Sequence, residues 1–357
     1  MADAPLRFGV WGVVGGSWAS AHHPDDPPDA SWARNRALVV ESERLGYDST
    51  LIAQHTINPR GDEQDQLEAW TAAAALAAVT NDIEIIVAIK PYLFHPVVLA
   101  KMALQIEEIS EGRLALNLVN AWYRPELDRA GIGFVDHDDR YAYGTEWLQV
   151  VTALIAGETT TFHGRHFDVD GYTLRPRSAW RERPRIYVGG ESDPARDLVA
   201  AHADTWFING QPPDEVGALI ADVRARPRPG TPVTFGLSAF VIARDTDEEA
   251  EAALAAAWEL HALDRPALEH VRANADPKAV MFQTFARHPA IGTNGGTAAG
   301  LVGSYDTVAR RIREFGDLGI ELFMLQFQPF EAEMRRFAAE VIPRVRAFER
   351  ALEGASR

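Results

Sequence analysis

The residues from Ile83 to Asn120 constrain the fold more than any other part of the sequence. The segment 83–89, IEIIVAI, is nearly all apolar and rich in β-branched residues, which is typical of a strand buried on both faces of a parallel sheet. Pro96 fits the first turn of a helix, and the apolar residues after it recur at helical spacing until Gly112, which fits the position just past a helix end. The segment 114–119, LALNLV, is predicted to be a second buried strand. Such a unit requires a right-handed crossover, so it predicts a parallel α/β fold.

Strand and helix patterns alternate in this way along nearly the whole chain. We count about eight strand-then-helix repeats, the number in a closed (β/α)8 barrel. No low-complexity segment or linker divides the sequence, so we expect one TIM-like barrel domain over residues 1–357. The segment 233–243 is predicted to be one long strand. Residues 264–299 break the rhythm and are predicted to be a loop-rich insertion near the rim of the sheet that acts as a mobile lid.

The composition excludes several classes of function. Lys and Arg number 35 against 51 Asp and Glu, a formal net charge of −16, which argues against nucleic acid and anionic membranes as partners. The absence of cysteine excludes disulfides, thiolate catalysis and zinc–sulfur sites, and it fits a cytoplasmic protein. No apolar run approaches the roughly 18 residues that a membrane-spanning helix needs.

Polar residues follow several of the predicted strands. Lys90 follows the first strand of the opening unit, and Asn117 and Asn120 lie at the end of the second. The carboxyl ends of parallel strands form one rim of the sheet, where ligands of α/β folds bind. A buried amide needs a partner, which for the two asparagines is a ligand or a loop that they cap.

Two further patterns suggest binding of an anion. The segment 189–193, GGESD, lies between a predicted strand and a predicted helix, so it suits phosphate at a helix N-terminus; Ser192 or Asp193 fits an ordinary helix cap equally well. Arg140 could hold a phosphate with two hydrogen bonds. The simpler alternative for Arg140 is an ion pair with a nearby acid, namely Asp136, Asp138 or Asp139.

The histidines do not predict a metal site. His22, His23 and His55 lack a third ligand at a characteristic spacing, and cysteine ligands are absent. His22 and His23 are best interpreted as solvated loop residues. His55 follows the second predicted strand, faces the same rim and is a candidate for acid–base chemistry.

Several longer motifs resemble those of the bacterial luciferase-like flavin-dependent monooxygenases, in the branch of the alkanesulfonate, dimethyl sulfone and pyrimidine monooxygenases. The similarity covers nearly the whole chain, and the motifs occur in the same order. The matching segments are HPVVLAKMALQIEEISEGRLALNLV, HDDRYAYGTEWLQVV, FHGRHFDVDGYTLRPRS, YVGGESDPARDL and GLVGSYDTVARRIREFGDLGIELFMLQF.

The resemblance implies a TIM-like barrel with an insertion near its penultimate strand, and an enzyme that uses FMN and O2. FMN would be reduced by a separate NAD(P)H:flavin reductase, and the enzyme would be a homodimer or a homotetramer. The positions that correspond to flavin-binding residues of the family are Asn117, Glu126, Arg140, Tyr141, Gly190 and Ser192. Arg140 and Ser192 are expected to anchor the phosphate, Asn117 and Asn209 to orient the ring and the substrate, and His55 and Gln54 to support proton transfer or substrate binding.

This chain departs from the alkanesulfonate enzymes at their active-site positions. Two arginines of those enzymes correspond to Ser238 and Asn294, so the resemblance implies a pocket that is polar but uncharged. A sulfone, amide or similar neutral substrate suits such a pocket better than a sulfonate. The other departures, at a cysteine, a tryptophan, a histidine and a tyrosine of those enzymes, are Gln66, Asn209, Phe240 and Gln328. Three alternatives on the same fold are a deazaflavin-dependent hydride-transfer enzyme, an amide or pyrimidine ring-opening monooxygenase and a flavin-binding relative without enzymatic activity. The full rim of candidate ligands and the long insertion argue against the third.

Overall fold

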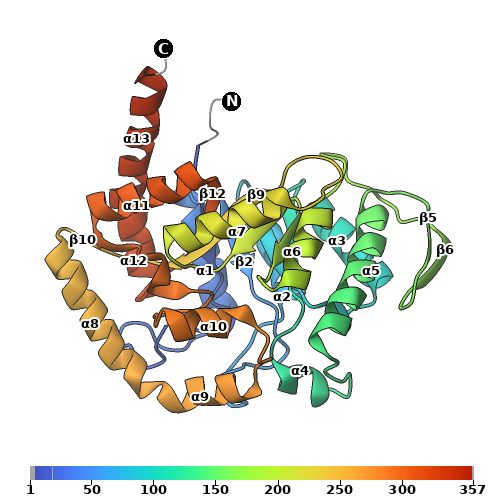
Figure 1. The fold of residues 1–357 in the computed structure, drawn as a ribbon, viewed down its shortest axis with the longest axis horizontal. Coiled ribbons are helices and arrows are strands. Elements are labelled where there is room, and N and C mark those ends of the chain that lie inside the picture. Colours follow the sequence, from blue (N-terminus) through green and yellow to red (C-terminus); the bar gives the residue numbers. More distant parts are fainter. Residues whose placement is uncertain (1–4, 18, 356–357) are drawn as a thin grey trace.

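Eight parallel strands close into a barrel in the computed structural model, which describes residues 5–17 and 19–355 (Figure 1). The first barrel strand pairs with both the second and the last, which completes the ring. The predicted barrel is therefore confirmed. Its strands, in the order in which they follow one another around the ring, are β1 (Arg7–Trp11), β2 (Ser49–Ile52), β3 (Glu84–Ile89), β4 (Leu114–Leu118), β7 (Arg185–Gly189), β8 (Thr205–Ile208), β9 (Thr234–Phe240) and β12 (Ile320–Gln326).

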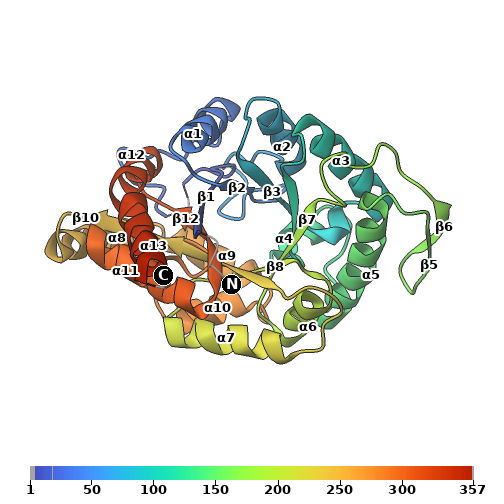
Figure 2. The same cartoon turned by 90° about the horizontal axis from the view of Figure 1, so that it is seen from above.

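Helices surround the barrel, as the view from above shows (Figure 2). The short helix α4 (Arg124–Asp128) follows β4 directly. The surrounding helices are α1 (Trp32–Arg44), α2 (Ala69–Ala77), α3 (Pro96–Ile109), α5 (His137–Ile155), α6 (Asp193–His202), α7 (Pro213–Ala225), α11 (Tyr305–Leu318), α12 (Phe330–Arg336) and α13 (Ile342–Ala355). None of the described helices is long and apolar enough to cross a membrane.

Three buried tryptophans donate to backbone carbonyls in strand β3 and in the segments that follow β3 and β7. The indole N–H of Trp70 donates to the carbonyl of Ala88 (3.1 Å), and that of Trp147 donates to Phe94 (2.8 Å). Trp206 in β8 donates in the same way to Gly190 (2.8 Å). Each side chain combines a large apolar surface with one satisfied polar atom, so the backbone around the rim is held in place.

Helix α5 begins earlier than expected. The sequence predicted a helix from about Tyr143, whereas the helix starts at His137 with Asp136 as its N-cap. The Asp136 carboxylate accepts from the Asp138 amide (3.2 Å), and acids in the first turn favour a helix N-terminus. As a result Arg140 and Tyr141 are helical residues.

The prediction of one long strand over 233–243 was wrong. Strand β9 ends at Phe240, and after it β10 (Ile242–Arg244) leaves the barrel to pair with β11 (Val302–Ser304) in a separate two-stranded sheet. The predicted hairpin is confirmed as β5 (Thr160–His163) and β6 (Asp168–Tyr172), outside the barrel.

The insertion between β9 and β12 is mostly helical, so the expectation of a loop-rich segment over 264–299 was wrong. Helix α8 (Asp247–Leu263) leads into α9 (Arg265–Asn274) and α10 (Val280–Arg287), which lie below the barrel in Figure 1. A short 3-10 turn, Gly296–Ala299, follows. Pro266 occupies the first turn of α9, where proline is tolerated. Helix α9 contains no fully buried residue.

Candidate active site

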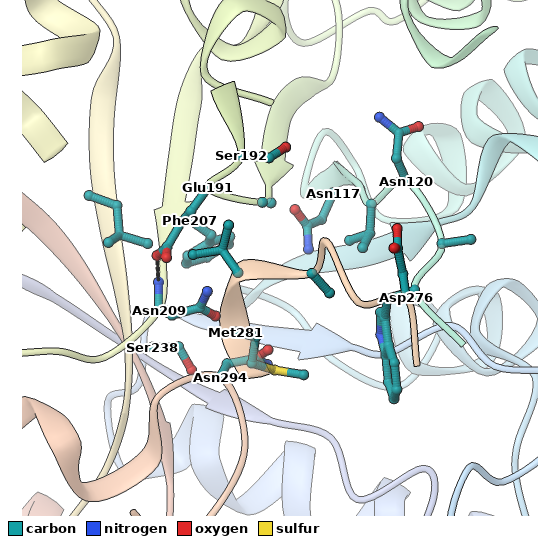
Figure 3. Close-up of a pocket in the computed structure, with 18 of the residues that line it drawn as sticks. Asn117, Asn120, Glu191, Ser192, Phe207, Asn209, Ser238, Asp276, Met281 and Asn294 are labelled. Atoms are coloured by element: carbon teal, nitrogen blue, oxygen red, sulfur yellow. Dashed lines mark hydrogen bonds between the residues drawn. The ribbon is translucent and has the colours of Figure 1, made fainter. Parts of the chain in front are cut away.

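A cavity of about 150 Å³ opens at the carboxyl ends of the barrel strands, beneath the insertion (Figure 3). A second cavity of about 100 Å³ adjoins it, shares Asn117, Trp122, Met281 and Asn294, and continues to Gln54, His55 and Lys90. The polar and aromatic residues that line the larger cavity include Asn117, Asn120, Trp122, Tyr141, Glu191, Ser192, Phe207, Asn209, Ser238, Asp276, Lys278 and Asn294.

Several neutral amide atoms on these walls have no partner within the part of the chain that the structure describes. The amide oxygen of Asn117 and both amide heteroatoms of Asn120 and Gln54 are buried without a hydrogen bond from the described residues. Buried polar groups are normally satisfied, so each of these atoms is available to a ligand. The structure thus places Asn117, Asn120 and Gln54, all three of them candidates from the sequence, around the two adjoining cavities.

The segment from Gly190 to Ser192 shapes one corner of the larger cavity. Gly190 has a φ of +110°, and a Cβ at this position would lie 2.8 Å from the hydroxyl of Tyr141. Only glycine allows this approach. Ser192 is the N-cap residue of α6, but its side chain does not cap the helix. Backbone N–H groups at the start of α6 therefore border the cavity beside Tyr141, an arrangement that favours an anion.

Arg140 does not line the cavity. It is 2% exposed, forms an ion pair with Asp276 of the insertion, donates to the carbonyl of Val135 (2.6 Å) and stacks over Phe134 at 4.0 Å. The alternative of an ion pair was right in kind, but the partner is none of the three nearby acids named from the sequence. Asp276 itself forms part of the wall, so it separates Arg140 from the space that a ligand would enter.

His55, Lys90 and Glu126 form a buried cluster at the smaller cavity. Lys90 Nζ lies 2.9 Å from His55 Nδ1 and forms an ion pair with Glu126 Oε2, while Glu126 Oε1 accepts from the Thr56 amide (2.6 Å). Burial and the neighbouring Lys90 cation lower the pKa of His55. Burial opposes ionisation of Glu126, but Lys90 and His55 outweigh it and hold the pKa of this carboxyl well below its usual range. Glu126, expected to bind flavin, is thus committed to the cluster and lies on neither cavity wall.

Glu191 is a buried acid of the larger cavity that the sequence did not single out as a site residue. Its Oε1 accepts from the backbone N–H of Asn209 (2.7 Å) and from the side chain of Gln211 (3.2 Å). Burial raises the pKa of Glu191. In Figure 3 this contact joins the segments after β7 and β8, which fixes Asn209 at the cavity. The sequence did contain a signal for Glu191, because this acid directly follows a pair of glycines between a predicted strand and a predicted helix.

The remaining predicted residues divide into two groups. Ser238 and Asn294 line the larger cavity. Gln66 and Gln328 do not line it, and their side chains form hydrogen bonds elsewhere in the protein instead. Gln66 donates to the carbonyl of Leu67 (2.9 Å), and Gln328 donates to Ser17 Oγ and to the carbonyl of Ser20 (2.7 Å each).

Comparison with known proteins identifies the class to which this fold and cavity belong. The family model "Luciferase-like monooxygenase" matches residues 14–322, so the chain belongs to the luciferase-like monooxygenase family. It is 30% identical over 367 residues to an FMNH(2)-dependent dimethylsulfone monooxygenase of Pseudomonas putida, covering 97% of this chain and 96% of that protein. The Pseudomonas fluorescens (strain Pf0-1) protein of the same name is also 30% identical, over 362 residues, covering 98% and 97%. Long-chain alkane monooxygenase (LadA) shares the fold, with a TM-score of 0.79 at 18% identity over 97% of this chain and 92% of that one.

Proposed function

We propose that this protein is a two-component monooxygenase that uses reduced FMN and O2 to oxidise a small organosulfur compound, most suitably an uncharged sulfone. The observation that carries the proposal is the full-length similarity to the dimethylsulfone monooxygenases, which are named for their dependence on FMNH2. The connected cavities at the carboxyl rim supply a site of the expected kind.

The residues around the larger cavity fit a flavin mononucleotide. The N-terminus of α6, with Gly190, Ser192 and the Tyr141 hydroxyl, would hold the phosphate, and the unsatisfied amides of Asn117 and Asn120 would bond the polar edge of the ring. Bound reduced FMN supplies the electrons that activate O2. The chain orients the ring and the substrate and, by covering the rim with the insertion, keeps water from the reacting atoms.

The charges at the cavities favour a neutral substrate. Lys90 is paired with Glu126, and Lys278 lies 3.3 Å from Asp136 and 3.8 Å from Asp138. A sulfonate leaving water needs charge-assisted partners, and these cations are already neutralised. Ser238, Asn209 and Asn294 offer neutral hydrogen bonds instead.

Oxygen uptake tests the proposal directly. The purified protein is mixed with FMN, NAD(P)H and a flavin reductase, and O2 consumption and substrate loss are followed for dimethyl sulfone, small amides, uracil, methanesulfonate and octanesulfonate. We expect turnover of dimethyl sulfone and little of either sulfonate. Efficient desulfonation with the sulfone inert would contradict the assignment of a neutral substrate, and turnover of uracil or amides alone would favour the ring-opening alternative. Hydride transfer to a deazaflavin without O2 would overturn the proposal.

The expected reductase partner, the homodimer or homotetramer and the cytoplasmic location stay predictions. Sedimentation analysis of the purified chain distinguishes a monomer from either oligomer. The reductase is tested by replacing it with chemically reduced FMN, which we expect to support a single turnover without any second protein.

A further inference from the structure

We propose that Lys90 and Glu126 fix the proton of His55 on Nε2, so that His55 is a neutral hydrogen-bond donor to an acceptor oxygen of the substrate rather than a general base. The smaller cavity, with Gln54 as a second neutral donor, would then be the subsite for a sulfone, sulfoxide or carbonyl oxygen. The nature of the ligand rests on the proposed function, whereas the position of the proton does not.

The first step concerns the bond between Lys90 and His55. An ammonium group has three donors and no acceptor, so the His55 Nδ1 that lies 2.9 Å from Lys90 Nζ must accept. Burial lowers the pKa of Lys90, but the ion pair with the Glu126 carboxylate opposes this shift, so Lys90 is an ammonium paired with that carboxylate. A neutral imidazole that accepts at Nδ1 carries its proton on Nε2.

The second step is that the cluster is held rigidly. Glu126 Oε1 accepts from both the amide and the hydroxyl of Thr56 (2.6 and 3.3 Å), which leaves Oε2 directed at Lys90. The ring of His55 meets Trp122 edge to face at 5.5 Å. Glu126 Oε1 lies 3.6 Å from His55 Nδ1, beyond a hydrogen bond, so the carboxylate does not compete for that nitrogen. Lys90 and Glu126 are thus positioning residues.

The third step concerns the space that His55 faces. His55 lines the smaller cavity next to Gln54, which is 2% exposed and has no partner among the described residues for either amide heteroatom. The Nε2–H and the Gln54 amide can both donate to one ligand oxygen there. For His55 to accept a proton from a substrate, Nε2 would need a free lone pair, and this tautomer does not provide one. The earlier expectation of acid–base chemistry at His55 is therefore replaced by recognition of an acceptor oxygen.

The tautomer is measured by nitrogen NMR of the flavin-free protein labelled with ¹⁵N at histidine. The His55 signals are assigned by their loss in His55→Gln. We expect a protonated, pyrrole-type Nε2 and an unprotonated, pyridine-type Nδ1 throughout neutral pH. A proton on Nδ1, or on both nitrogens at neutral pH, would overturn the proposal. Because this measurement needs neither flavin nor O2, its outcome is independent of whether the monooxygenase assay succeeds.

Variants of Lys90 connect the tautomer to substrate recognition. Lys90→Met removes the donor, so we expect the Nε2–H signature to be lost and the KM for dimethyl sulfone to rise about 3–10-fold, the effect of one neutral hydrogen bond. Lys90→Arg restores a cation and should recover both readouts. Lys101→Met, at an exposed lysine of α3, is the matched control. An unchanged tautomer in Lys90→Met, or an equal change in the control, would contradict the proposal; if Lys90→Met fails to fold, the wild-type spectrum and Lys90→Arg still decide it.

Discussion

Two buried ion pairs border the cavities, and they differ in what they join. Lys90 and Glu126 connect the segments that follow β3 and β4, both parts of the barrel rim. Arg140 and Asp276 connect helix α5 of the barrel to the insertion between α9 and α10. All four side chains are nearly inaccessible to solvent. The Lys90–Glu126 pair therefore holds two segments of the barrel rim together, whereas the Arg140–Asp276 pair attaches the insertion to the barrel.

The comparison shows that burial alone does not define the role of an ion pair. Desolvation offsets much of the attraction in such pairs, so their main contribution is to specify one arrangement. The first pair has its remaining carboxylate oxygen satisfied by Thr56 and sets the environment of His55. In the second, Asp276 also accepts from the Lys278 amide (2.9 Å) and lies on the cavity wall, where a phosphate would compete with it for Arg140.

The largest expected effect is the loss of stability when the pair of Lys90 and Glu126 is broken. Glu126→Gln and Lys90→Met each leave one buried charge without its partner, so each should lower the free energy of unfolding by about 3–5 kcal/mol. Urea denaturation followed by circular dichroism measures this loss. Asp62→Asn, which breaks the exposed pair with Arg129 (2.8 Å), is the control and should leave the midpoint nearly unchanged.

A double variant sharpens this test. Lys90→Met combined with Glu126→Gln removes both charges, so it should lose clearly less stability than the two single losses added together. Strict additivity of the two substitutions would show that the side chains do not interact in the folded protein.

The two regions also show which features could be predicted from the sequence and which could not. The barrel followed from local periodicity in segments such as 83–119, because strand and helix patterns depend on near neighbours. The partner of Arg140 did not, since Asp276 lies 136 residues away in a segment whose helices bury almost nothing. The positions of Asn117, Gly190 and Ser192 on the cavity wall could be predicted because each lies near the end of a strand or the start of a helix. The His55–Lys90–Glu126 cluster requires three rim segments to converge, which no local pattern shows.

A smaller effect is expected on the affinity for FMN when the second pair, Arg140 and Asp276, is changed. If the phosphate takes the place of Asp276 at Arg140, Arg140→Ala should weaken FMN binding by about 1–3 kcal/mol, the range for lost charge-assisted hydrogen bonds. Asp276→Asn should retain or increase the affinity, since it removes the competing charge. Fluorescence titration of FMN measures both. Unchanged affinity in Arg140→Ala would mean that this arginine serves the insertion alone.

The smallest expected effect is on the motion of the insertion, which we still expect to be a lid over residues 264–299. Hydrogen exchange should be faster there than in the barrel strands of the flavin-free protein, because α9 has no fully buried residue and local stability follows buried contact. Asp276→Asn should accelerate exchange in this segment while leaving β3 and β4 unchanged, since it weakens only the attachment to α5. Flavin and substrate should slow the exchange as the lid closes. Equally slow exchange with and without ligands, or an acceleration spread over the barrel, would show instead that the insertion is a rigid part of the fold.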